Sequence, residues 1–382
     1  DRASHESSYA LHLNPDNREA WYLRTFSKYF LGKYEEVSID ATQEIKKNPQ
    51  NEDAFDLRGR AMFFLRDYKK SVEDMDKSIF LNFDNGYAFY YRGFSKYFLK
   101  QYEAAIKDVN QAILLEPSCK NPTISFLLAC SNMELESYEN AIVQLNELVQ
   151  VFPEFAIEHD LHYERAECLI NTESYEDAIK DLNFSILIKP TSYKFFERGF
   201  CKLQLKIYKE AIKDFNTAIE LDEDNENTYL NRAISYFGLN KYYNVINDNM
   251  KVIELDPKNE VAYRYLGLAK LELNDFYNSI YDLSKAIQIN PSDTKSYGAI
   301  CLAKFMQEKF LFALEDCSTA INLDPTGGKD GYLYNYRANI YLKLSKRNNA
   351  CEDFEKAIRY GFKYNKNLKI TNRIYNYKNC KL

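Results

Sequence analysis

Two adjacent stretches, Tyr229–Asn240 and Tyr242–Leu255, read YLNRAISYFGLN and YYNVINDNMKVIEL. In each stretch the apolar side chains follow one another at the three- to four-residue spacing of a single helix face. A short polar turn separates the stretches, and Pro257 follows the second, where it prevents the helix from continuing. The segment therefore predicts two antiparallel helices joined by a tight turn.

The same pattern recurs along the chain with a period close to 34 residues. Gaps of 34 residues separate several prolines, and Pro49 and Pro117 are two such gaps apart. An aromatic residue keeps this spacing at Tyr34, Tyr68, Tyr102, Tyr138, Tyr175, Tyr208, Tyr242, Phe276 and Phe310. A small residue follows three places later at Ala105, Ala141, Ala178, Ala211 and Ala313. This period predicts a stack of helix pairs, because one pair cannot bury its apolar face alone.

The composition agrees with a helical repeat and disfavours other classes. Nine prolines and twelve glycines in 382 residues are few for a β-sandwich or a string of linked domains. Aromatic residues make up 15% of the chain, which is too many for a disordered protein. A rule of about 150 residues per domain would divide the chain into two or three domains. The repeat period predicts one elongated solenoid instead.

These residues resemble the motif of the tetratricopeptide repeat (TPR) superfamily. That motif has an aromatic residue at repeat position 4, a small residue at 8, tyrosine at 17, alanine at 20 and 27, and proline at 32. Ten repeats can be matched, starting at residues 18, 52, 86, 122, 159, 192, 226, 260, 294 and 331. Eight of the nine prolines then fall at position 32. The resemblance implies an all-α fold, an α-solenoid of antiparallel helix pairs in a right-handed superhelix.

The match divides the chain into five segments. They are the second helix of a truncated repeat (1–17), repeats 1–3 (18–119), an irregular repeat 4 with flanking insertions (120–158), repeats 5–10 (159–364) and a basic cap or tail (365–382). Because residue 1 falls inside a repeat, we expect the chain to be a piece of a longer one. In repeat 4, Ser125 replaces the core aromatic residue and Pro122 opens the repeat. A local irregularity is therefore predicted between residues 118 and 160.

Arginine at repeat position 7 and aspartate at position 23 recur together along the chain. The arginines are Arg24, Arg58, Arg92, Arg165, Arg198, Arg232 and Arg337. The aspartates are Asp40, Asp74, Asp108, Asp181, Asp214, Asp248, Asp282, Asp316 and Asp353. Repeat 4 lacks both residues and has Leu128 and Gln144 instead. The joint loss predicts that the two side chains pair across the helices of one repeat, as a guanidinium and a carboxylate do.

Charge and cysteine content bear on the partners and the compartment. The net charge of −6 argues against a general binder of nucleic acids or anionic membranes. No run of 18 apolar residues predicts a transmembrane helix, and the polar N-terminus shows no signal peptide. The eight cysteines form no CxxC pair and are interpreted as free thiols in a reducing compartment. We therefore expect an intracellular, cytoplasmic location, with a secreted protein that has unpaired cysteines as the alternative.

Catalytic and metal-binding motifs are not found in the sequence. GxGxxG, GxxxxGK[ST], GxSxG and HExxH are absent, and we predict no catalytic residues and no cofactor. His159 and His162 form an HxxH pair of the kind that can offer two metal ligands. His162 occupies the packing position 4, so we interpret it as a core histidine, interpret His159 as a surface histidine, and predict no metal site.

The resemblance implies that positions 2, 5, 6, 9 and 13 of each first helix face a concave groove. Aromatic rings exposed in such a groove would anchor a peptide, although some of them could instead pack between repeats. Residues 154–177 contain eight acids and one arginine, which predicts a basic partner segment or, alternatively, an ordinary solvated surface. The predicted partner-binding residues are Tyr22, Phe26, Tyr90, Tyr91, Phe94, Asp160, Tyr163, Glu164, Glu167, Phe196, Glu197 and Phe200.

The leading hypothesis for function is a non-catalytic scaffold or adaptor. It would bind an extended or helical segment of a partner protein in the groove, within a larger multiprotein assembly. We expect no small-molecule substrate and no membrane insertion, and nucleic acid is disfavoured. One alternative is the docking or regulatory region of a longer enzyme chain. A less favoured one is an RNA-associated helical-repeat protein, for which the basic tail is the only support.

Overall fold

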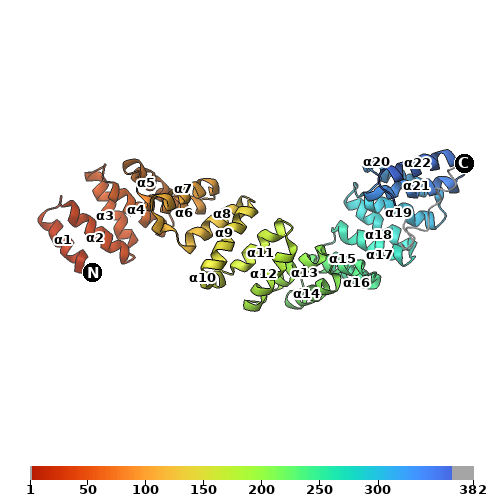
Figure 1. Ribbon diagram of the computed structural model, residues 1–382, viewed down its shortest axis with the longest axis horizontal. Coiled ribbons are helices and arrows are strands. Elements are labelled where there is room, and N and C mark those ends of the chain that lie inside the picture. Colours follow the sequence, from red (N-terminus) through yellow and green to blue (C-terminus); the bar gives the residue numbers. More distant parts are fainter. Residues whose placement is uncertain (1, 364–382) are drawn as a thin grey trace. The chain divides into compact units, whose positions relative to one another are not determined.

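The computed structural model describes residues 2–363, apart from the side chains of residues 2–4 and 330 (Figure 1). Within that range the chain forms α-helices and two 3₁₀ helices and contains no strand. The predicted all-α solenoid of antiparallel helix pairs is confirmed. The predicted cap or tail at 365–382 lies outside the described residues.

The chain divides into two compact units, residues 1–188 (unit 1) and 189–382 (unit 2), and each is described by itself. Unit 1 contains α1 (Arg2–Leu13), α2 (Arg18–Phe30), α3 (Tyr34–Lys47), α4 (Glu52–Phe64), α5 (Tyr68–Leu81), α6 (Gly86–Phe98), α7 (Tyr102–Leu115), η1 (Pro117–Cys119), α8 (Pro122–Glu134), α9 (Tyr138–Val151), α10 (Pro153–Glu158), α11 (Leu161–Asn171) and α12 (Tyr175–Ile188). Unit 2 contains α13 (Ser192–Gln204), α14 (Tyr208–Leu221), α15 (Glu226–Gly238), α16 (Tyr242–Leu255), α17 (Glu260–Glu272), α18 (Phe276–Ile289), α19 (Thr294–Met306), α20 (Phe310–Leu323), η2 (Lys329–Gly331), α21 (Tyr332–Lys343) and α22 (Arg347–Arg359).

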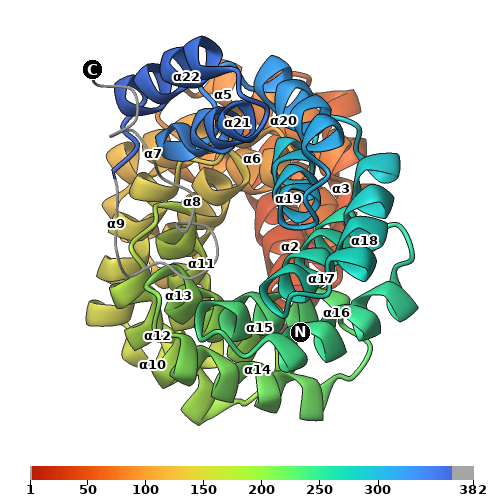
Figure 2. The same ribbon diagram turned by 90° about the vertical axis from the view of Figure 1, so that its right-hand side faces the viewer.

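Within each unit, the first helices of consecutive repeats contact one another. In unit 1, α2 contacts α4 and α4 contacts α6, and in unit 2, α13 contacts α15 and α15 contacts α17. Contacts between consecutive second helices are sparse by comparison. In Figure 2, α15 and α17 lie on the inner side of unit 2, and α14, α16 and α18 lie on its outer side. The first helices therefore share one surface in each unit, which we call the first-helix face.

Small residues let the two helices of a repeat approach closely. A Cβ atom added to Gly93 would lie 2.7 Å from Val109 Cγ2 and 3.3 Å from the carbonyl oxygen of Ala105. The position-20 alanines Ala105, Ala141, Ala178, Ala211 and Ala313 are all fully buried. Any larger side chain at these contacts would force the helices apart, because protein cores are close-packed.

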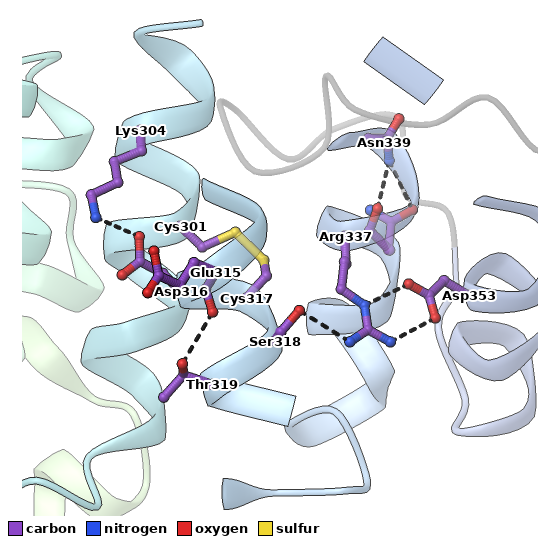
Figure 3. Close-up of a disulfide and its surroundings, with 11 residues drawn as sticks. Cys301, Lys304, Glu315, Asp316, Cys317, Ser318, Thr319, Arg337, Asn339 and Asp353 are labelled. Carbon is purple, nitrogen blue, oxygen red and sulfur yellow. Dashed lines mark hydrogen bonds and ion pairs between the residues drawn. A yellow bond between two sulfur atoms is a disulfide. The ribbon is translucent and has the colours of Figure 1, made fainter. Parts of the chain in front are cut away.

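All seven predicted arginine–aspartate pairs form across the two helices of one repeat. Their shortest nitrogen–oxygen distances lie between 2.5 and 3.0 Å. Six of the seven are two-bonded forks, as in Arg337, whose Nε and Nη2 donate to Asp353 (Figure 3). Residues 16 positions apart, one on each helix, therefore face each other where the two helices of a repeat pack together.

A lysine takes over where the arginine is missing. In repeat 8 the Nζ atom of Lys270 lies 2.6 Å from Asp282, and in repeat 9 that of Lys304 lies 2.7 Å from Asp316. Repeat 4, which lacks both charges, has a neutral substitute, because Asn132 donates to Gln144 at 3.2 Å. In every repeat that has an aspartate at position 23, an arginine or lysine therefore pairs with the carboxylate. Such a partner is needed because a buried, unpaired charge is strongly destabilising.

Additional short helices interrupt the regular order of helix pairs on both sides of repeat 4. The 3₁₀ helix η1 precedes it, and the extra six-residue helix α10 follows α9 before repeat 5 begins. Pro122 stands in the first turn of α8, where its missing N–H costs nothing, and Asn121 caps the helix by accepting from the backbone N–H of Ile124. Asp160 then adopts a left-handed conformation with φ of 52°, which redirects the chain into α11.

The expectation of free thiols is wrong for Cys301, Cys317 and Cys351, which are all disulfide-bonded. Cys301 on α19 and Cys317 on α20 form a disulfide, with their Cα atoms 5.3 Å apart (Figure 3). Their 16-residue separation equals that of the arginine–aspartate pairs, one position further along each helix, so the helix register brings them together. Free thiols are present at Cys119, Cys130, Cys168 and Cys201.

None of the helices within residues 2–363 has the length and apolar character needed to cross a bilayer.

Candidate functional site

Aromatic rings from α2, α4 and α6 form a connected cluster on the first-helix face of unit 1. Tyr29 and Tyr91 join the outer repeats directly, because their hydroxyl oxygens lie 2.7 Å apart although the residues are 62 positions apart in sequence. Phe63 and Phe64 of the middle repeat contact Tyr91 at centroid distances of 5.5 and 6.1 Å. Tyr90 is 5.1 Å from Tyr91. We call these five residues the aromatic cluster.

An ion pair lies beside the aromatic cluster in the middle repeat. Arg60 Nη2 is 2.6 Å from Asp56 Oδ2, and both side chains are largely buried. The Arg60 guanidinium also stands over the rings of Tyr87 and Tyr91, at 5.1 and 5.4 Å from their centroids. Such cation–π contacts strengthen when water is excluded. The arginine is therefore held by one carboxylate and two rings.

Two atoms of this ion pair have no hydrogen-bond partner among the described residues. They are Asp56 Oδ1 and Arg60 Nε. Burial raises the pKa of Asp56, and the positive charge of Arg60 opposes this rise. The side-chain amide of Asn85 lies near Asp56 and also lowers that pKa. The hydrogen bonds that this amide donates go to Glu52 and Ser78. Unsatisfied buried polar atoms are costly, so this pair has bonding capacity left for another group.

The predicted groove residues of repeat 1 lie at the edge of this site. Tyr22 stacks on Phe26 with centroids 5.3 Å apart, and Phe26 makes an edge contact with Phe30 at 4.7 Å. Tyr22 and Phe26 are half-buried, whereas the Phe30 side chain is 72% exposed. Burial and the nearby Asp53 carboxylate raise the pKa of Tyr22. These rings form a stack that ends at an exposed phenylalanine.

Among the repeat 3 residues, Phe94 does not lie at the surface as expected. Phe94 is 8% exposed and belongs to the core cluster that contains Val109 and Ile124. The ring packs between repeats, against residues of α8 that include Leu127 and Leu128. Tyr90 stacks on Phe94 at 4.6 Å, and Tyr90 and Tyr91 remain half-buried. Phe94 therefore lies in the core beneath the aromatic cluster and contacts it through Tyr90.

The predicted acidic residues of repeat 5 gather on α11 and the turn before it. Tyr163 donates to Glu167 Oε1 at 3.0 Å, and Ser185 donates to Asp160 Oδ1 at 2.6 Å. Burial, together with the charges of Glu167 and Asp160, raises the pKa of Glu164 to about 7. Burial also raises the pKa of Glu167. These carboxylates repel one another, so a positive group placed among them would be stabilised.

The neighbours of Glu164 include two thiols. Burial raises the pKa of Cys130 and of Cys168 to about 12, and the charge of Glu164 contributes to both shifts. Both thiols are therefore protonated near neutral pH and do not act as nucleophiles. Their presence adds apolar surroundings to Glu164 and no compensating positive charge.

The remaining predicted residues, Phe196, Glu197 and Phe200, lie on α13 in unit 2. All three are half-buried, and the Phe196 ring is 6.1 Å from Phe215 in the core of that unit. The predicted residues of unit 1 thus lie on α2, α6 and α11 and in the turn before α11, with Phe94 in the core, and the other three lie on α13 of unit 2.

Sequence reasoning missed Asp53, Asp56 and Arg60. They occupy positions 2, 5 and 9 of repeat 2. These positions belong to the set from which the binding residues of repeats 1 and 3 were predicted. The signal was therefore present, but charged residues there did not suggest an aromatic site. The cation–π contacts of Arg60 became visible only in the structure.

The histidine pair takes the places that the sequence predicts. His162 Nδ1 lies 3.0 Å from Asp181 Oδ1 and joins the fork of Arg165, while His159 is exposed and rests on Phe155 at 4.2 Å. Over the described residues, no group of three or more histidine, cysteine, aspartate or glutamate side chains is arranged to hold a metal ion.

Comparisons with known proteins identify the repeats. A family model described as TPR repeat matches residues 203–240, and one described as tetratricopeptide repeat matches residues 332–360. Together with the tandem helix pairs, they confirm the sequence-based recognition: the chain is a tetratricopeptide repeat protein. A search of curated proteins finds no match.

Two solved structures show the same fold. A tetratricopeptide repeat protein from Parabacteroides merdae is 16% identical, covers 66% of this chain and 96% of its own, and has a TM-score of 0.52. The C-terminal part of a TPR repeat-containing protein from Cytophaga hutchinsonii is 19% identical, covers 63% of this chain and 98% of its own, and has a TM-score of 0.52. At these identities the likeness supports the solenoid fold alone.

Proposed function

We propose that this chain is a non-catalytic scaffold that binds a segment of another protein on the first-helix face of unit 1. TPR arrays are protein-interaction folds, and this chain carries such repeats. The observation that carries the proposal is the ion pair of Asp56 and Arg60 beside the aromatic cluster, with one unsatisfied atom on each partner. An extended or helical segment would bring backbone donors and acceptors to these atoms and apolar side chains to the rings.

The acidic residues of repeat 5 define the charge of the partner segment. Asp160, Glu164 and Glu167 lie together on the same unit, and no described lysine or arginine forms an ion pair with Glu164 or Glu167. A lysine or arginine of the partner would supply the missing positive charge. We therefore infer a basic partner segment and, because both units present such faces, a place in a larger multiprotein assembly.

Selection of random twelve-residue peptides on the intact chain tests this proposal. Enriched peptides should carry lysine or arginine together with apolar residues. Reversal of Glu164 and Glu167 to lysine should weaken their binding about tenfold or more, because buried charge pairs of this kind carry several kcal/mol. Reversal of Glu103, an exposed residue of the second helix α7, is the matched control and should leave binding unchanged. Equal binding by both variants would reject the site.

The expected cytoplasmic location rested on free thiols and loses that support. Disulfides such as Cys301–Cys317 persist mainly in oxidising compartments. Thiol alkylation of the natural protein in denaturant without a reductant decides the matter, because both sulfur atoms are buried in the folded chain. Labelling of Cys301 and Cys317 would favour the cytoplasm, and protection of both would favour an oxidising compartment.

A further inference from the structure

An exposed apolar ladder runs along the second helices of unit 2. Tyr243, Tyr277 and Leu311 occupy repeat position 18 of repeats 7, 8 and 9, and their side chains are 73%, 79% and 69% exposed. The same position is charged in the six preceding repeats, at Glu35, Lys69, Glu103, Glu139, Glu176 and Lys209. Fold requirements alone do not explain the change, because a solvent-facing position accepts charge elsewhere in the array.

A pocket opens beside this ladder, between α18 and the turn that joins α19 to α20. Its volume is about 420 Å³. The apolar part of its wall consists of Tyr277, Ile280, Tyr281 and Phe312, and the rings of Tyr281 and Phe312 are 60% and 61% exposed. Three aromatic rings around one hollow form the kind of site that receives a large apolar side chain.

The polar part of the wall is positive. Lys304, Gln307 and Lys309 line the pocket, and no carboxylate is part of its lining. Asp316 neutralises Lys304 at 2.7 Å. Lys309 forms no ion pair with a described carboxylate, and neither does Lys285, whose Nζ atom stands 5.8 Å from the centroid of the Tyr281 ring and donates to Gln288. Two uncompensated lysines therefore flank the pocket in a chain whose net charge is −6.

One wall residue also has hydrogen-bonding capacity left. The Oε1 atom of Gln307 is buried and accepts no hydrogen bond from the described residues. A turn of this side chain toward the pocket would let Oε1 accept from a backbone N–H of a bound segment. The unsatisfied acceptor thus favours a peptide over a purely apolar molecule.

The walls are held in place by covalent and ionic links. Figure 3 shows the Cys301–Cys317 disulfide and the Lys304–Asp316 ion pair between α19 and α20, which involve adjacent residues of α20. These links fix the two helices that carry Lys304 and Phe312. A preformed site loses little conformational entropy when it binds, which favours affinity.

We propose that this pocket is a second docking site, distinct from the first-helix face. Its occupant is a segment of a partner protein with an aromatic or large aliphatic anchor flanked by acidic residues. The anchor fills the hollow between Tyr277 and Phe312, and the acidic residues pair with Lys285 and Lys309. The ladder residues Tyr243 and Leu311 extend the apolar contact along α16 and α20.

Three blocked ten-residue peptides test this site on the intact chain by isothermal titration calorimetry. The first has a central Trp-Leu flanked by aspartates, the second has Trp-Leu flanked by lysines, and the third has Ala-Ala flanked by aspartates. We expect binding of the first peptide and at least about tenfold weaker binding of the other two, because both the anchor and the acidic residues are required.

Single variants locate the binding. Tyr277→Ala and Phe312→Ala should each weaken the first peptide about tenfold or more, since these are central anchors. The double reversal Lys285→Glu and Lys309→Glu should weaken it further and remove its salt dependence. Phe80→Ala, which removes an 81% exposed ring in unit 1, and Lys209→Glu, an exposed reversal in unit 2, are matched controls. These side chains are exposed, apart from the half-buried Lys285, so the variants should fold, and circular dichroism checks that they do.

Four results would overturn the proposal. The first is that the first peptide does not bind at about 1 mM, a concentration at which even weak binding is detected. The second is that the lysine-flanked peptide binds as tightly as the first peptide. The third is that the first peptide binds Tyr277→Ala and Phe312→Ala as tightly as the unaltered chain. The fourth is a concentration-dependent dimer in sedimentation that Tyr277→Ala abolishes, because the pocket would then receive a second copy of this chain.

Discussion

Removal of the Cys301–Cys317 disulfide should loosen one helix pair without unfolding the array. The perturbation is the double variant Cys301→Ala and Cys317→Ala. Alanine already occupies the position of Cys301 in repeats 4, 5, 7 and 10, at Ala129, Ala166, Ala233 and Ala338, so the helices tolerate it there. The change therefore removes mainly the cross-link.

The magnitude follows from the length of the closed loop. The bridge joins residues 16 positions apart, and a loop of that size contributes about 3 kcal/mol by restricting the unfolded chain. Repeat proteins unfold in local units, so the loss should fall on α19 and α20. A loss of about 3 kcal/mol corresponds to roughly a hundredfold faster opening of this helix pair.

Hydrogen exchange read by mass spectrometry is the suitable assay. The only tryptophan, Trp21, is buried in unit 1, so its fluorescence cannot follow repeat 9. Peptides from α19 and α20 should exchange roughly a hundredfold faster in the double variant, while peptides from α2 should not change. The same acceleration should follow when a reductant is added to the unaltered chain.

A matched control separates the cross-link from the buried sulfur atoms. Cys201 is a free thiol in the same unit and is fully buried, as Cys301 and Cys317 are. Cys201→Ala thus measures the cost of deleting one buried sulfur. If the double variant loses no more than twice the stability that Cys201→Ala loses, the reasoning about the cross-link is refuted.

Three further predictions concern the helix contacts and one carboxylate. Asp353→Ala should destabilise repeat 10 by about 3 kcal/mol, because it leaves Arg337 without its carboxylate, whereas Asp177→Ala at an exposed pair should cost below about 1 kcal/mol; denaturant unfolding checks both. Gly267→Ala should destabilise by about 1–3 kcal/mol in the same assay, since the added Cβ would meet Leu283 Cγ at 2.6 Å, and a neutral effect would contradict the packing argument. The folded pKa of Glu164, raised to about 7, lies above the unfolded value, so the folded state holds the extra proton and stability falls as pH rises from about 4.5 to 7. Glu164→Gln should flatten that fall in thermal unfolding measured at pH 5 and pH 8, and an identical pH profile would show that Glu164 is not the group responsible.

Much of the fold was predictable because the same residue pattern occurs in every repeat. Ten copies average out local ambiguity, so the aromatic, alanine and proline positions locate both helices of each pair. The arginine–aspartate forks were predictable for the same reason, since repeat 4 loses both partners at once. Periodicity converts a weak local signal into a strong one.

The turns between the two helices were not predictable in the same way. Repeat position 15 is left-handed in every repeat, yet glycine occupies it only at Gly32. Residues such as Arg66 and Lys100 adopt φ near 60° there. The left-handed conformation usually favours glycine, and here the packing of the two helices imposes it on other residues.

The candidate site was only partly visible in the sequence. The resemblance placed Tyr90 and Tyr91 on the first-helix face, but it could not show that Phe94 turns into the core. Nor could it show that Arg60 lies over two rings, because these contacts join separate repeats. Contacts between repeats depend on how the helices stack, and the motif within one repeat does not specify them.

The sequence by itself determined the helix pairs, their order and the repeat family, because these depend on spacing within about 34 residues of chain. The tertiary structure decided which side chains of different helices meet. It joined Tyr29 to Tyr91, linked Cys301 to Cys317, and left Tyr277 and Phe312 exposed around a pocket. The physical reason is that periodicity records which face of a helix is buried, whereas a site requires distances between faces, and these arise only when the helices pack.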